Sequence, residues 1–102
     1  MAMPQNLVKE RYIKAKLEDS PLDIRYRKKN GKFVRRRIEP YELKSEAVYD
    51  DYGYRKIVTY LYGYDITPGL KLEKKVIKRW IISQFDICRV MPRTTFKPRW
   101  FV

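Results

Sequence analysis

Histidine is absent from this sequence of 102 residues, and cysteine occurs once. Without histidine the chain lacks the commonest general base, the centre of serine–histidine–aspartate triads and the ligand of most zinc sites. The single Cys88 cannot form an internal disulfide, and it ends the largely apolar run Phe85-Asp86-Ile87-Cys88, so we expect a buried structural thiol. The adjacent carboxylates Asp50-Asp51 lie in a turn-like segment and point apart. These features predict a protein that is not an enzyme and has neither a metal nor a cofactor.

Long apolar segments are also absent. Residues 1–6 contain no apolar core of a signal peptide, and no segment approaches the roughly 18 apolar residues that a membrane helix needs. We therefore expect a cytoplasmic protein with no membrane contact. A length of 102 residues, 44% of them hydrophobic, suits one folded domain and leaves no room for a second core.

Positive charge is what the sequence has in excess. Lys and Arg number 24 against 12 Asp and Glu, which gives a formal net charge of +12. Residues 1–38 hold 12 basic and 4 acidic residues (net +8), residues 39–65 hold 3 and 6 (net −3), and residues 66–102 hold 9 and 2 (net +7). This layout predicts a polarised surface and favours an anionic partner: nucleic acid, a nucleotide-like anion or an acidic protein surface. The simpler alternative is a charged surface that only keeps the protein soluble.

Two periodicities predict a helix followed by strands. Over about residues 5–17, apolar residues recur at spacings of three and four between Pro4 and the terminating Asp19-Ser20-Pro21, which indicates a short amphipathic helix. Residues 57–64 carry apolar or aromatic side chains on both faces, which is typical of a central strand or a barrel strand. Residues 49–54 are turn-like and are expected to form an exposed loop.

Other strands are expected at the following ranges: 22–27, 34–38, 41–43, about 76–82 and 86–90. The strand at 41–43 is short and begins anew after Pro40. Trp80 shares one strand face with Val76 and Ile82 in this scheme, so we expect it to be buried. The fold class predicted is mainly β: a small, strongly bent antiparallel β-barrel over about 22–90, preceded by one short N-terminal helix and followed by an extended tail over 91–102.

Two registers are open to the hairpin around Asn30-Gly31. A two-residue loop pairs Ile24 with Arg37 and Tyr26 with Arg35, which puts apolar and charged residues on one face. A three-residue loop with a left-handed Gly31 pairs Leu22 with Ile38 and Tyr26 with Val34, and it keeps one face largely apolar. We favour the three-residue loop.

That register has a consequence for the arginines. It places Arg25 opposite Arg35 on the outer face, with Arg27 and Arg37 beside them. Like charges on opposed strands destabilise the pair, so a bound anion would compensate for the repulsion. The alternative is that the long side chains splay into water.

The order of short motifs along the chain resembles the WYL domain family. The motifs are Ile24-Arg25-Tyr26, a turn glycine, Arg37-Ile38-Glu39-Pro40-Tyr41, Tyr60-Leu61-Tyr62-Gly63-Tyr64-Asp65, Arg79-Trp80-Ile81-Ile82 and Phe96-Lys97-Pro98-Arg99-Trp100. The resemblance covers about residues 10–100 and implies an Sm-like small β-barrel. It also implies a ligand-sensing or nucleic-acid-binding module of bacterial or phage regulators. Thr59 stands at the tryptophan of the signature tripeptide; in the late basic motif Lys78 is kept, while Ser83 and Gln84 replace an aspartate and an arginine.

Three hypotheses for function follow. The first is binding of nucleic acid, single-stranded or duplex, through phosphate contacts, with aromatic rings as stacking surfaces. The second, which rests on the resemblance, is sensing of a nucleotide-like anion held against Tyr60 and Lys78. The third is modulation of a partner protein through an acidic surface of that partner. The candidate binding residues are Arg25, Arg27, Arg35, Arg36, Arg37, Tyr60, Lys78 and Arg79. The oligomeric state stays open, a homodimer included.

Overall fold

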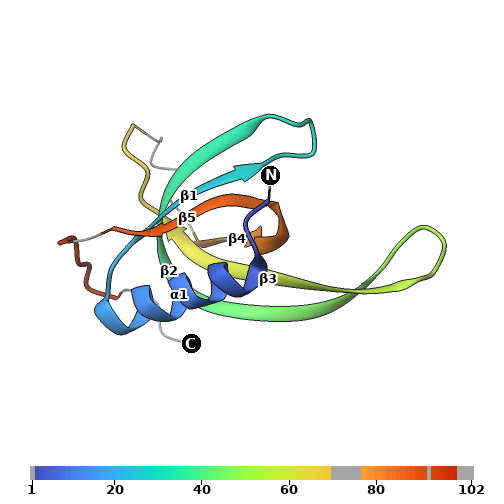
Figure 1. The fold of residues 1–102 in the computed structure, drawn as a ribbon, viewed down its shortest axis with the longest axis horizontal. Coiled ribbons are helices and arrows are strands. Elements are labelled where there is room, and N and C mark those ends of the chain that lie inside the picture. The colour runs from blue at the N-terminus through green and yellow to red at the C-terminus, as the bar shows by residue number, and fades with distance from the viewer. Residues whose placement is uncertain (1, 70–76, 92, 99–102) are drawn as a thin grey trace.

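One antiparallel sheet and one helix make up the computed structural model, which describes residues 2–69, 77–91 and 93–98 (Figure 1). The elements are α1 (Gln5–Glu18), β1 (Leu22–Arg27), β2 (Phe33–Tyr49), β3 (Arg55–Asp65), β4 (Ile77–Ile81), the 3-10 turn η2 (Ile82–Gln84) and β5 (Phe85–Val90). The sheet order is β4-β3-β2-β1-β5. The predicted mainly β class with one helix is confirmed. The sheet is not closed into a barrel, because no pairing joins the two edge strands over the described residues.

The β1–β2 hairpin has the register expected from a three-residue loop. Leu22 pairs with Ile38, and Tyr26 pairs with Val34. Gly31 has a φ of 83°, the left-handed conformation that glycine adopts without strain. The apolar side chains of Leu22, Ile24 and Ile38 are consequently turned inward and have no exposed surface.

The middle of β2 corrects the prediction of a new, short strand after Pro40. The strand runs without a break over 17 residues, and it curves strongly along its length (Figure 1). Proline lacks an N–H group, and it is tolerated here because the pairing with β1 ends at Ile38 and the register with β3 shifts between Pro40 and Glu42. The segment 41–43 is therefore the centre of one long strand that both hairpins share.

The core lies between the sheet and α1. The helix buries Val8 and Ala15, and the hydroxyl of Tyr12 donates a hydrogen bond to the carbonyl oxygen of Tyr41 at 3.0 Å. Trp80 is buried as predicted, with 7% of its surface exposed. Cys88 is also buried as predicted, and burial raises the pKa of its thiol to about 12. The predicted strand start at 76 and the tail end at 99–102 lie outside the described residues.

Residues 47–57 form an arm that projects from the body as the far end of the β2–β3 hairpin (Figure 1). Within the described sheet, β4 pairs with β3 only from Tyr60 to Tyr64, so the strands of the arm pair with each other alone. Asp50 holds the tip, because its Oδ1 accepts hydrogen bonds from the backbone N–H groups of Tyr52 and Tyr54, both at 2.9 Å. The segment 49–54 is exposed as predicted, although Tyr49 still belongs to β2. In the described part of the chain, α1 is too short and too polar to cross a membrane.

Candidate anion-binding face and pocket

The outer face of β5, β1 and β2 carries an arginine face, which we define as Arg25, Arg27, Arg35, Arg37 and Arg89. Arg25 and Arg35 stand directly opposite each other, as the predicted register requires. Arg89 joins them because β5 pairs with β1 and places it opposite Asp23. Three strands that are distant in sequence thus bring five guanidinium groups to one side of the sheet.

The repulsion expected between Arg25 and Arg35 is relieved by carboxylates of the chain itself, and not by either of the two routes that the sequence suggested, a bound anion or side chains splayed into water. The Arg25 guanidinium lies 3.1 Å from a carboxylate oxygen of Asp86. Asp23 accepts from two arginines at once, with Arg35 at 3.1 Å and Arg89 at 2.7 Å. Each of the opposed arginines therefore has a carboxylate partner, which Arg35 shares with Arg89.

Two members of the face are left without such a partner. Arg27 and Arg37 are exposed and form no ion pair with any residue that the structure describes. Five arginines face two aspartates, Asp23 and Asp86, so the face keeps a surplus of three positive charges. An open groove of about 370 Å³ runs beside Arg35, Arg37 and Arg89. We call it the arginine groove.

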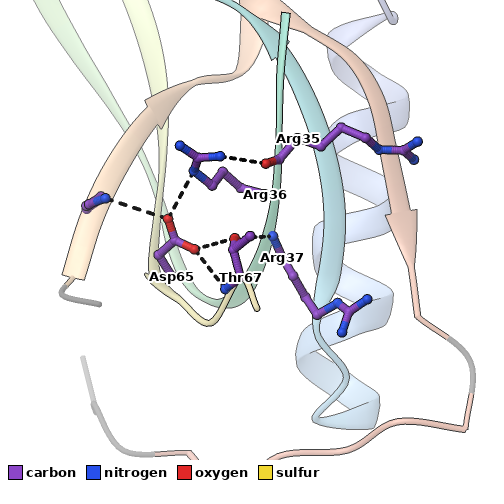
Figure 2. A network of polar contacts seen from close by, with 6 residues as sticks. Arg35, Arg36, Arg37, Asp65 and Thr67 are labelled. Atoms are coloured by element: carbon purple, nitrogen blue, oxygen red, sulfur yellow. Dashed lines mark hydrogen bonds and ion pairs between the residues drawn. The ribbon is translucent and has the colours of Figure 1, made fainter. Parts of the chain in front are cut away.

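Arg36 is held differently from its neighbours in the sequence (Figure 2). Its Nε lies 3.4 Å from Oδ2 of Asp65, a carboxylate with no exposed surface, and the Nζ of Lys78 lies 3.6 Å from the same oxygen. The other oxygen, Oδ1, accepts hydrogen bonds from the backbone N–H and the hydroxyl of Thr67, whose oxygen accepts the backbone N–H of Arg37. Because a buried carboxylate needs cationic and hydrogen-bonding partners, Arg36 and Lys78 are committed to holding Asp65.

A second concavity gathers the remaining candidates. An open pocket of about 760 Å³ is lined by Tyr60, Lys78 and Arg79 and by the neighbouring Trp80 and Gln84. The guanidinium of Arg79 lies 4.3 Å from the centroid of the Tyr60 ring, a cation–π contact, and 3.5 Å from Glu46. Hydrogen bonding to the side chain of Tyr62, above all, raises the pKa of Arg79. This aromatic pocket is thus cationic and lined by rings.

No family model, curated protein or solved structure matches this chain. The WYL resemblance and the site residues therefore stay predictions. Over residues 2–69, 77–91 and 93–98, no cluster of three acidic or cysteine side chains could hold a metal ion.

The sequence reasoning missed Asp23, Asp65 and Arg89. Asp23 could have been found from the sequence, because the alternation along β1 puts it on the same face as Arg25, opposite the face of the apolar residues. Asp65 ends a strand that is apolar on both faces, where a charge requires a partner. Nothing in the sequence indicated that Arg89 belongs to the arginine face, because only the pairing of β5 with β1 brings it there.

Proposed function

We propose that this protein is a non-enzymatic regulatory module that binds nucleic acid, single-stranded or duplex, through phosphate contacts. The arginine face carries the proposal, because five guanidinium groups share one side of the sheet with a surplus of three charges. Guanidinium groups bind phosphate oxygens bidentately, and a surface of this charge attracts a phosphate backbone from a distance.

The arginines of the face offer two kinds of phosphate-binding group, unpaired guanidinium groups and guanidinium groups held by a carboxylate. Arg27 and Arg37 are exposed and offer complete guanidinium groups to phosphates. Arg35 and Arg89 are held in place by Asp23, and each keeps N–H donors that the carboxylate does not use. Pre-oriented donors lose little side-chain freedom on binding, which favours affinity.

We also propose that the sheet is bent into a small barrel. The edge strands β4 and β5 are joined by η2, which is only three residues long. A short connection between the two edges of a five-stranded sheet favours a strongly bent, Sm-like barrel of the WYL type. In that arrangement the arginine face is the outside of the barrel wall.

The test compares two matched double variants. Arg27→Gln with Arg37→Gln removes the two unpaired members of the arginine face, and Lys9→Gln with Lys14→Gln removes two exposed charges on α1. Titrations of single-stranded and duplex DNA and RNA at several salt concentrations should show weaker binding for the first pair alone. The slope of log affinity against log salt should fall by up to about two in that variant. Equal losses in both variants would mean that net charge, and not this face, binds nucleic acid.

A second candidate function, sensing of a nucleotide-like anion, is favoured by the aromatic pocket. The lining of that pocket includes the aromatic side chains of Tyr60 and Tyr62, and Arg79 supplies a charge that is only partly engaged by Glu46. Calorimetry with mononucleotides and cyclic dinucleotides tests it, with Arg79→Gln expected to abolish binding and Arg27→Gln to leave it unchanged. If neither oligonucleotides nor nucleotides bind, an acidic surface of a partner protein becomes the leading ligand of the arginine face.

A further inference from the structure

The arm exposes aromatic side chains that no residue described by the structure covers. Tyr49, Tyr52 and Tyr54 are 69%, 87% and 73% exposed, and Ile57 is 57% exposed. A two-stranded ribbon is marginally stable in water by itself, and clustered exposed apolar groups mark surfaces that bind other proteins. The tyrosines are therefore placed for a partner and not for the core.

The charge of the arm differs from that of the body. Residues 47–57 hold two acidic and two basic residues, so the arm is neutral in a chain of net charge +12. At the tip, residues 49–54, both charged residues are acidic: Asp50 and Asp51. Asp50 is engaged by backbone N–H groups, whereas Asp51 is exposed and has no ion pair among the described residues. An acidic tip repels phosphate, which argues against nucleic acid as its ligand.

The complementary surface lies on this same chain. The arginine groove is hollow and basic, and Arg37 at its side has no carboxylate partner within the part of the chain that is described. The arm points away from the body (Figure 1), whereas the groove is lined by residues of β1, β5 and the first part of β2. The continuous strands of the hairpin therefore hold the tip and the groove of one molecule apart. A second copy of the chain satisfies both surfaces.

We propose that the arm tip docks in the arginine groove of a second copy, reciprocally, to form a two-fold homodimer. Asp51 pairs with Arg37 of the other copy, and the Tyr52 ring packs on the guanidinium of Arg89. Each contact occurs twice, as in any isologous interface. The repulsion between two basic bodies is screened beyond about 8 Å at physiological ionic strength, while the short contacts at the tip are not. This dimer does not depend on nucleic-acid binding, but it covers part of the proposed binding face.

The decisive test uses charge reversal in both partners. Asp51→Arg and Arg37→Asp should each weaken self-association about tenfold or more, measured by sedimentation velocity and light scattering at physiological ionic strength. Mixing the two single variants should restore the dimer, because the mixed pair contains one native and one reversed contact. Glu10→Arg and Lys29→Asp make the same charge changes on exposed sites away from the tip and groove, and they should leave association unchanged.

The aromatic contact is tested separately. Tyr52→Ser should weaken the dimer, while Leu17→Ser, which removes an exposed apolar side chain from α1, should not. Circular dichroism checks that each variant is folded, and if Asp51→Arg is not, the Tyr52 comparison decides. A wild-type protein that stays monomeric at high concentration would refute the proposal, as would failure of the mixture to restore association. Arm variants that change oligonucleotide affinity in a monomeric protein would assign the arm to nucleic acid instead.

Discussion

Ile57 and Leu61 point to the same face of β3, only four residues apart, yet Ile57 is 57% exposed and Leu61 has no exposed surface. Leu61 lies in the body, where β4 pairs with β3 and places Trp80 beside it. Ile57 lies in the arm, where β2 is the single neighbour of β3 among the described strands. The difference teaches that the second neighbouring strand, and not the side chain's own hydrophobicity, decides whether this face is buried. Body and arm should therefore respond differently to the same kinds of substitution.

Trp80→Ala should give the largest effect. Its ring is buried against Leu61, so its removal leaves a cavity and should lower the free energy of unfolding by about 3–5 kcal/mol. Chemical denaturation measures the loss. If the variant melts like the wild type but no longer binds nucleotides, Trp80 is a stacking residue of the aromatic pocket, and its burial contributes little.

A matched pair of glycine substitutions compares body and arm directly. In the body, a Cβ on Gly63 would lie 2.7 Å from the backbone oxygen of Glu39, so Gly63→Ala should cost about 1–3 kcal/mol through forced backbone shifts. In the arm, Gly53 has a φ of 81° with open space around it, so Gly53→Ala should cost only the left-handed strain, about 1 kcal/mol. Thermal melts of the two variants at equal concentration test the order. A larger loss for Gly53→Ala would mean that the arm turn contributes more to stability than the close approach of Gly63 to Glu39 does.

Tyr52→Ser should give the smallest effect on the folded monomer. The ring is 87% exposed, so its loss should change the free energy of unfolding by no more than about 0.5 kcal/mol when measured at low protein concentration. At high concentration the same variant should lose the stabilisation that dimer formation adds. A large loss at low concentration would show that the arm packs on the body in solution.

Local pattern was sufficient for much of the fold. The helix, the β1–β2 register and the exposed tip could be predicted because each depends on spacing or turn chemistry within a few residues. Pro40 was misjudged because a proline read locally indicates the end of a strand. In the fold it lies beyond the first residue of β1, where its missing N–H group breaks no pairing with β1. The burial of Trp80 was predicted correctly from an alternation on one strand face.

The arginine cluster shows where sequence alone stops. The sequence by itself determined that four arginines would share the outer face of one hairpin, since strand alternation and the loop length require it. Only the tertiary structure decided how they are held, because Asp86, which pairs with Arg25, and Arg89, which shares Asp23 with Arg35, arrive with β5. Those contacts join residues far apart in sequence, and the electrostatic energy of a pair depends on a distance that no local pattern encodes.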